Sequence, residues 1–194
     1  MNLYDFDKTV YYKDCTVEFW KYCLRRKPYL IFGLPIQAFG FFLYKLKIKP
    51  KEYFKSAFLF FIKHFKNIEE ETERFWDKEE RNICRHFRDM LKEGDVIVSA
   101  SPEFLVAPMA KRLGVRCLAS PVDSKTARFT APNCKGEEKL RRLAAIGITS
   151  AEQAFSDSAS DLPMLSLAKE GFVIKNLSLS EYKIIKKITV VSEP

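Results

Sequence analysis

Asn2-Leu3-Tyr4-Asp5-Phe6-Asp7-Lys8-Thr9 stands near the beginning of the chain. Leu3 and Tyr4 form a short apolar lead into an acidic turn, the pattern of a brief buried strand that ends in polar residues. Asp5 and Asp7 are two residues apart, so they share a face wherever the backbone is extended. Just past a strand end, one carboxylate can attack an electrophile while the other handles protons. The stretch therefore predicts one corner of a catalytic site.

Polar residues also follow two other predicted strands. The run 95–99 has the apolar, β-branched composition of a buried strand and ends in Ser99, and the run 153–156 leads into Asp157. Ligands bind at the carboxyl ends of the strands in open α/β sheets. We therefore expect Asp5, Ser99 and Asp157 to lie at one site.

Strands alternate with helices through most of the remaining chain. Further strands are predicted at 115–118 and 171–174, a small hairpin within 127–134, and helices at 104–113, 136–146 and 162–169. This alternation predicts an α/β fold, with a Rossmann-like core of about five parallel strands covered on both faces. The intervening region is almost wholly helical in pattern. We predict a core domain formed by residues 1–11 and 93–194, and an inserted, mostly α-helical cap domain at residues 12–92.

Composition indicates a soluble globular protein. The 194 residues are 47% hydrophobic and 30% charged, and the five cysteines are odd in number and form no Cys-x-x-Cys pair. A disulfide framework or zinc site is therefore not expected, and the cytoplasm is the expected location. Asp5 and Asp7 interrupt the region where the apolar run of a signal peptide would begin. The net charge of +8 favours anionic partners, although we expect no nucleic acid among them.

The acidic residues indicate magnesium as the cofactor. Asp157 and Asp161 are four residues apart, one turn if a helix starts between them. Oxygen ligands without a Cys/His cluster favour Mg²⁺ over Zn²⁺. A carboxylate that attacks a phosphate ester also needs its own charge and that of the phosphoryl group offset, which Mg²⁺ does by bridging both.

Cations and amides are available for the phosphoryl oxygens. Lys135 and Lys139 flank a predicted helix start at Gly136, where either ammonium can neutralise these oxygens. Ser99 and the backbone amide of Ala100, in the turn that follows the strand, can donate hydrogen bonds to them.

These residues together resemble the motifs of the haloacid dehalogenase superfamily. Asp5-x-Asp7-x-Thr9 resembles its first motif, and Val96-Ile97-Val98-Ser99 resembles the second, an apolar strand that ends in Ser or Thr. The segment 156–161 resembles the fourth motif, in which two aspartates are spaced Asp-x-x-x-Asp. Order, spacing and strand context agree along the whole chain.

The resemblance implies a phosphatase mechanism. Asp5 would attack the phosphate ester to give an aspartyl-phosphate, and Asp7 would protonate the leaving group and then activate water. Asp5, the backbone carbonyl of Asp7, and Asp157 would hold Mg²⁺. Asp161 would support that shell or orient the lysine.

The long helical insertion is similar to the helical cap of the phosphoserine-phosphatase-like branch, and this similarity indicates the subgroup of the superfamily. Residues 133–137 resemble the Lys-Gly segment of phosphoserine phosphatases, but Gly136-Glu137-Glu138-Lys139 resembles the Gly-Glu-x-Lys form of a sister group with phosphatidylglycerophosphatase-like members. The third-motif lysine is thus Lys135 or Lys139, and we favour Lys139. Asp14 lies nine residues after Asp5, where phosphoserine phosphatases carry a carboxylate that faces the substrate amino group.

The substrate stays open between a small phosphometabolite such as phosphoserine and a phospholipid head-group phosphate. Residues 28–44 carry no charged side chain and have basic residues on both flanks, a pattern that fits peripheral contact with an anionic membrane. The alternative is an internal cap core with solvated lysines. Other possible functions are non-catalytic binding of anionic partners by the same fold, or phosphoryl transfer to an acceptor other than water. The oligomeric state is left open.

Overall fold

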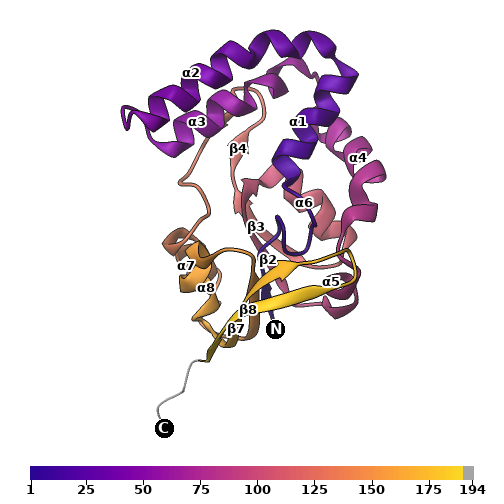
Figure 1. Cartoon of the computed structure of the whole chain (residues 1–194), viewed down its shortest axis with the longest axis vertical. Coiled ribbons are helices and arrows are strands. Elements are labelled where there is room, and N and C mark those ends of the chain that lie inside the picture. Colours follow the sequence, from indigo (N-terminus) through magenta and orange to yellow (C-terminus); the bar gives the residue numbers. More distant parts are fainter. Residues whose placement is uncertain (190–194) are drawn as a thin grey trace.

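The computed structural model describes residues 1–189, and its centre is a six-stranded sheet (Figure 1). The strands lie in the order β3-β2-β1-β6-β7-β8. Their bounds are β1 Leu3–Tyr4, β2 Val96–Pro102, β3 Arg116–Ser120, β6 Ala151–Ser156, β7 Ala168–Asn176 and β8 Tyr182–Thr189. In this sheet, β3, β2, β1, β6 and β7 run parallel to one another, and β8 is antiparallel to β7. The predicted α/β fold with a parallel sheet is confirmed.

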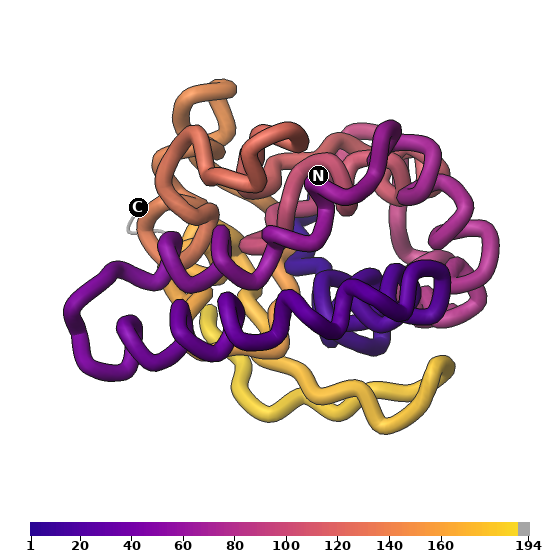
Figure 2. The backbone as a smooth tube through the Cα atoms, turned by 90° about the horizontal axis from the view of Figure 1, so that it is seen from above, coloured from indigo at the N-terminus to yellow at the C-terminus, as the bar shows by residue number. Residues whose placement is uncertain are grey.

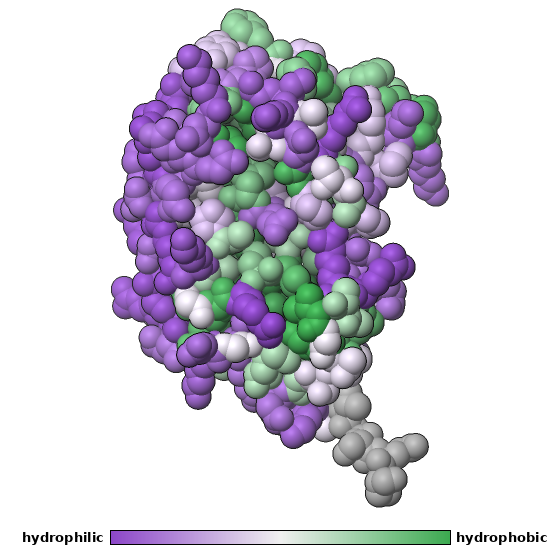
Figure 3. All heavy atoms as spheres, turned by 180° about the vertical axis from the view of Figure 1, so that it is seen from behind, coloured by the Kyte–Doolittle hydropathy of each residue, from purple (hydrophilic) through white to green (hydrophobic). Residues whose placement is uncertain are grey.

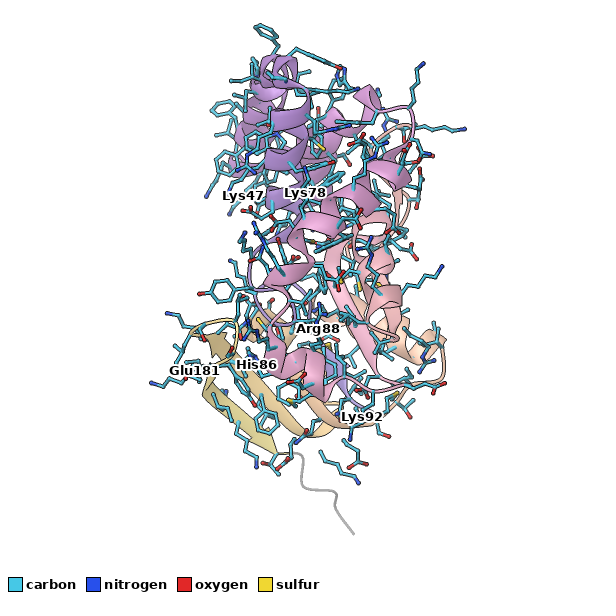
Figure 4. The ribbon with its side chains drawn as sticks, turned by 90° about the vertical axis from the view of Figure 1, so that its right-hand side faces the viewer. Lys47, Lys78, His86, Arg88, Lys92 and Glu181 are labelled. Carbon is cyan, nitrogen blue, oxygen red and sulfur yellow. The ribbon has the colours of Figure 1, made fainter. Side chains whose placement is uncertain are left out.

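Strand β8 was not predicted from the sequence. Most of its side chains are exposed and three of its eight residues are lysines, so it lacks the apolar alternation that marks a half-buried strand. Its first residue, Tyr182, packs on helix α5 (Arg85–Met90), with ring centroids 4.7 Å from His86 and 5.4 Å from Phe87. Figure 4 labels His86 beside Glu181, the residue before β8. The strand is thus held by its neighbours rather than by its own pattern.

The sheet is packed on both faces because side chains alternate along each strand. Leu3 belongs to a cluster that includes Leu143, Met164 and Leu165 from helices α7 (Glu137–Ala145) and α8 (Leu162–Leu165). Tyr4, the next residue, points into the larger cluster on the other face, where Phe87 of α5 and residues of α6 (Glu103–Arg112) are buried. Two packed faces explain why the central strands are apolar almost throughout.

The segment between β1 and β2 is helical, in agreement with the predicted helical insertion. Its elements are α1 Cys15–Arg26, η1 Pro28–Gly33, α2 Leu34–Lys45, α3 Lys51–Phe58, η2 Leu59–His64, α4 Ile68–Glu79 and η3 Glu80–Asn82, followed by α5. Helices α2 and α3 lie side by side at the end of the molecule away from β7 and β8 (Figures 1 and 2). The exact domain boundaries stay a prediction, and residues 190–194 of the predicted core domain lie outside the described residues.

The chain leaves the core and returns to it through two adjacent segments. Tyr11 forms an antiparallel bridge with Ile83, and the amide of Cys84 donates to the carbonyl of Val10 at 2.8 Å. Glu79 Oε2 accepts from the hydroxyl of Tyr11 at 2.8 Å, and also from Lys13 and Asn82. These contacts hold both crossing segments together.

Two local predictions differ from the structure. The hairpin pairs β4 (Val122–Asp123) with β5 (Arg128–Phe129), so it begins before the expected range of 127–134. Asp123 Oδ1 accepts from the amides of Lys125 and Thr126, and these bonds form the turn. Helix α8 is also shorter than predicted, because the chain enters β7 at Ala168.

Candidate active site

The candidate site lies at the carboxyl ends of the central strands. Chain order reverses at β1, which has β2 on one side and β6 on the other, and such a switch point is where open α/β sheets bind ligands. A cavity of about 480 Å³ lies there, between the strand ends and helix α3. Its lining includes Asp5, Asp7, Lys8, Asp14, Ala100, Lys135, Lys139, Asp157 and Asp161, and from the helical segment Thr16, Lys51, Phe54, Lys55 and Phe58.

Lys139 joins two carboxylates at the floor of the cavity. Its ammonium nitrogen lies 2.6 Å from Asp5 Oδ1 and 2.6 Å from Asp161 Oδ2, and its side chain is 1% exposed. Helix α7 positions the lysine in its first turn, immediately after Gly136, whose φ of 59° lies in the left-handed region that favours glycine. Three segments far apart in the sequence therefore meet at one ammonium group.

Asp7 is held in place by two donors. Its Oδ1 accepts from the amide of Cys15 at 2.7 Å, at the start of α1, and its Oδ2 accepts from the hydroxyl of Ser101 at 2.5 Å. Burial, with the nearby charge of Asp14, raises the pKa of Asp7 to about 6, against the opposing effect of these hydrogen bonds. A carboxyl with this pKa can carry a proton near neutral pH and then give it up.

The turn after Asp7 is tight. Lys8 has a φ of 58°, a left-handed conformation that is strained for a residue with a side chain. The amide of Lys8 donates to the carbonyl of Lys13 at 3.0 Å, and that of Thr9 to Phe6 at 3.3 Å. The turn brings the side chain of Lys8 to the cavity wall, near Asp157.

The predicted phosphate-binding residues on β2 occupy different positions. Ala100 lines the cavity, whereas Ser99 is 1% exposed and does not. The hydroxyl of Ser99 accepts from the amide of Ser101 at 3.1 Å, so it fixes the backbone that carries Ser101, whose own hydroxyl donates to Asp7. Of these two serines, it is Ser101 whose hydroxyl donates to a carboxylate of the site.

The acidic pair after β6 divides between the floor and the wall. Asp161 is 3% exposed and accepts from Ser156 Oγ at 2.8 Å as well as from Lys139, while its Oδ1 is buried without a hydrogen-bond partner. Asp157 is partly buried on the cavity wall, and burial raises its pKa. Ser158 caps the short turn between them through the amide of Ser160 at 3.2 Å.

Lys135 and Asp14 lie farther from the floor. Lys135 is exposed and lines the cavity, and no ion pair joins it to Asp5 in the described chain, in contrast to Lys139. Asp14 lines the cavity as well, and its Oδ1 accepts from the amide of Val17 at 3.0 Å as the N-cap of α1. Asp14 therefore combines a structural role with a position that a substrate can reach.

Apart from Asp14, the cavity residues of the helical segment were not singled out from the sequence. Lys55 Nζ lies 2.7 Å from the carbonyl of Ala100 and 2.6 Å from Asn133 Oδ1, so it crosses from α3 to the core. Thr16 and Ser101 share a hydrogen bond of 3.0 Å across the same gap. These residues belong to no local motif, and only the packing of the helical segment over the strand ends brings them to the site.

The charge balance at the floor fits a divalent cation. Burial raises the pKa of Asp5 to about 7, and the negative charges of Asp161 and Asp7 act in the same direction. The charge of Lys139 lowers the pKa and offsets part of this increase. Within residues 1–189, no three His, Cys, Asp or Glu side chains are grouped closely enough to hold a metal alone. Asp5, Asp157 and the backbone carbonyl of Asp7 would instead be the oxygen donors, a mixed set of the kind that Mg²⁺ binds together with retained waters.

Comparisons with known proteins agree with this architecture. The sequence profile of the family described as haloacid dehalogenase-like hydrolase matches residues 3–166. No curated protein matches the sequence.

Among solved structures, a protein of unknown function from Bordetella pertussis Tohama I has a TM-score of 0.65 and 20% identity over 84% of each chain. A HAD family hydrolase from Salmonella enterica serovar Typhi has a TM-score of 0.54 and 19% identity, covering 86% of this chain and 59% of its own. A phosphoserine phosphohydrolase-like protein from Francisella tularensis SCHU S4 has a TM-score of 0.51 and 15% identity, covering 88% and 84%. These similarities establish a common fold.

Proposed function

Because the chain belongs to the haloacid dehalogenase-like hydrolase family, we propose that it is a Mg²⁺-dependent phosphatase that cleaves phosphate monoesters through an aspartyl-phosphate on Asp5. The observation that carries this proposal is the buried ammonium of Lys139, which lies 2.6 Å from both Asp5 and Asp161 at the floor of the cavity. An ion pair inside a cavity holds the carboxylate oriented and gives a phosphoryl group an adjacent cation.

The first half-reaction uses Asp5 and Asp7. A carboxylate oxygen of Asp5 forms a bond to phosphorus while the ester P–O bond breaks. The leaving alkoxide takes a proton from the carboxyl of Asp7, whose raised pKa supports this role as an acid. The alcohol leaves, and the phosphoryl group stays on Asp5.

The second half-reaction reverses the proton transfer. Asp7, now a carboxylate, takes a proton from water, and the oxygen of that water attacks phosphorus. The bond between phosphorus and Asp5 breaks, which releases inorganic phosphate and restores both aspartates. Hydrogen bonds from Cys15 and Ser101 keep Asp7 in one orientation through both steps.

Mg²⁺ would be held by Asp5, Asp157 and the backbone carbonyl of Asp7, and when bound it offsets the charge between carboxylate and phosphoryl group. Asp161 supports the same floor by orienting Lys139. We assign Lys139, rather than Lys135, as the lysine beside the nucleophile, because it is the one paired with Asp5.

The residues in the upper part of the cavity limit the class of substrate that the site can bind. Lys51, Lys55 and Lys135 place three ammonium groups there, beside the rings of Phe54 and Phe58. Burial and the charge of Lys51 lower the pKa of Lys55 to about 8, although the charges of Asp7 and Asp14 oppose the shift. The three ammonium groups support a substrate with an anionic group besides the phosphate, a description that fits both phosphoserine and a phospholipid head-group phosphate.

The test is a screen of phosphate monoesters, soluble and lipid-borne, with and without Mg²⁺. The wild type should release inorganic phosphate only with the metal, and Asp5→Asn should lose at least about a thousandfold in kcat because the nucleophile is gone. Trapped phosphoenzyme should be found on Asp5 in the wild type and be absent from Asp5→Asn.

Asp89→Asn provides the matched control. Asp89 is exposed on α5 and lies outside the cavity, so the same loss of charge should leave kcat unchanged. Equal activity of Asp5→Asn and Asp89→Asn would refute the mechanism.

A further inference from the structure

Helix α2 is apolar around its circumference but is covered on one side. Its inner side packs on α3 so closely that a Cβ on Gly40 would lie 2.6 Å from Cβ of Ala57, and Gln37 donates to the carbonyl of Phe58 at 3.1 Å. On its outer side, Phe39 is 59% exposed and Phe42 56%. A helix that is apolar all round is normally buried, so the outer side of α2 is unusual for a surface in water.

The exposed apolar side chains continue beyond the helix at both ends. Phe32, in η1, is 81% exposed, and Ile48, after α2, is 60% exposed. We call this the α2 surface, defined by Ile31, Phe32, Ile36, Phe39, Phe42 and Ile48. In the space-filling view from behind, green apolar atoms lie beside purple polar ones at the top of the molecule, the end that α2 occupies in Figure 1 (Figure 3). Contiguous patches of this kind mark interaction sites.

The charges around the α2 surface are of one sign. Residues 19–51 include no aspartate or glutamate, whereas basic residues stand on both flanks of the apolar run. Lys45 ends α2, and Lys47 and Lys49 follow it; all three are exposed, and none forms an ion pair in the described part of the chain. The partner of this surface must therefore accept apolar side chains and positive charge together.

A second copy of the chain does not meet this requirement. A two-fold dimer brings the same patch of both subunits together. The basic fringe of one subunit would then face that of the other, with no acidic residue between 19 and 51 to offset it.

We propose that the α2 surface docks on an anionic lipid bilayer. Aromatic and aliphatic side chains enter the boundary between head groups and acyl chains, while the flanking lysines contact lipid phosphates. The helix lies along the membrane, because its 12 residues span about 18 Å and a hydrocarbon core is about 30 Å thick. None of the helices in residues 1–189 has the length and apolarity needed to cross a bilayer.

The docking surface and the catalytic cavity lie on different sides of one helix layer. α3 packs against α2 and also contributes Lys51 and Lys55 to the cavity wall. Docking thus brings the enzyme to the membrane without blocking the cavity, and it goes beyond the proposed function because it needs neither Asp5 nor catalysis.

Vesicle co-sedimentation tests the proposal with the full-length protein. The wild type should sediment with phosphatidylcholine vesicles that contain phosphatidylglycerol and remain in the supernatant with phosphatidylcholine alone. The variant Phe32→Ser/Phe39→Ser/Phe42→Ser should lose at least tenfold in partition to the anionic vesicles. A matched variant, Leu177→Ser/Ile184→Ser/Ile185→Ser, changes similarly exposed apolar residues on and beside β8 and should bind as the wild type does.

The electrostatic part has its own pair of variants. Lys45→Gln/Lys47→Asn/Lys49→Gln should weaken binding roughly fivefold per charge removed. Asparagine is chosen for Lys47 because its φ of 58° is left-handed, a conformation that asparagine tolerates. The control Lys92→Gln/Lys183→Gln/Lys186→Gln removes the same charge elsewhere and should bind normally; Lys92 lies toward the opposite end of the molecule from Lys47 (Figure 4).

Two results would overturn the proposal. One is equal sedimentation of the wild type and the aromatic variant; the other is a wild-type dimer that the aromatic variant abolishes, while neither protein binds vesicles. Far-UV circular dichroism must show both variants folded. Hydrolysis of the soluble ester p-nitrophenyl phosphate reports on the proposed function separately, since it should be equal in the wild type and the aromatic variant.

Discussion

Lys8 has a side chain where the backbone favours glycine. Its φ of 58° places it in the left-handed region, which costs about 1–2 kcal/mol for a residue with a Cβ. The same turn brings its ammonium to the cavity, near Asp157. Strain retained at a candidate site fits a functional need for the side chain.

Two substitutions of Lys8 separate strain from charge. Lys8→Gly should be about 1 kcal/mol more stable than Lys8→Ala in chemical denaturation, because only glycine relieves the strained turn. Both variants lose the charge, so both should show the same increase in KM for a phosphate ester. If the two variants unfolded at the same denaturant concentration, the turn would not be strained.

Lys55 should make substrate binding depend on pH. Burial and the charges of Lys51 and Lys135 lower its pKa to about 8, although Asp7 and Asp14 oppose this. The ammonium therefore loses its proton as the pH rises through about 8, and KM for an anionic substrate should increase from about pH 7 to about pH 9. Lys55→Arg, which stays charged over this range, should abolish the increase. A KM that rises equally in both proteins would assign the effect to another group.

The lowered pKa of Lys55 also affects the stability of the fold, which should increase with pH while substrate binding weakens. The pKa of Lys55 in the folded protein is lower than the value of about 10.4 in the unfolded chain. Between about pH 8 and about pH 10.4 the unfolded chain thus binds more protons at this residue, and the free energy of unfolding gains from it as the pH rises. In thermal unfolding across this pH window, the melting temperature of the wild type should rise relative to that of Lys55→Arg.

At the scale of elements, Asp14 links helix α1 to the cavity. Its side chain caps α1 through the amide of Val17 and also lines the cavity. Asp14→Asn should keep the cap, since asparagine is an equally good N-cap, whereas Asp14→Ala should cost about 1 kcal/mol of stability. Both should lower kcat/KM for phosphoserine more than for p-nitrophenyl phosphate, if the carboxylate faces an amino group. An equal loss for the two substrates would exclude that role.

The elements that the sequence predicted best are those that carry their own pattern. Asp5 follows a buried strand, and Lys135 and Lys139 flank Gly136 at a helix start, so local chemistry indicated Asp5 and two candidate lysines. The family resemblance then favoured Lys139. Lys55 and Ser101 could not be found in this way, because their roles depend on how α3 packs over the strand ends. Ser99 shows the limit within a motif: its position was predicted, but its hydroxyl accepts a hydrogen bond from the amide of Ser101 and does not line the cavity.

At the scale of the whole molecule, positive charge should attract the substrate. The net charge is +8, and lysines surround the upper cavity above an acidic floor. Raising the ionic strength from about 0.01 M to about 1 M shortens the Debye length from about 30 Å to about 3 Å. KM for an anionic ester should therefore rise severalfold while kcat changes little, because buried pairs are screened less. Steady-state kinetics with a neutral salt would check this, and an unchanged KM would contradict it.

The sheet order was predictable only in part. Alternating strands and helices indicate a parallel core, but the antiparallel strand β8 holds its place through Tyr182, which packs on α5. Long-range contacts of this kind leave no trace in the local pattern. The wider arrangement of the helical segment over the cavity likewise follows from packing and not from periodicity.

The crossing at Tyr11 and Ile83 has a consequence for the history of such a chain. The two crossing segments are neighbours, so a short turn could join them if the helices between them were removed. These helices therefore form an insertion that recombination can exchange as a unit. Asp5, Asp7, Lys139 and Asp161 all lie outside that insertion. A lineage can therefore acquire new substrates, or a new location in the cell, by exchange of the helical insertion while the residues of the candidate site are kept.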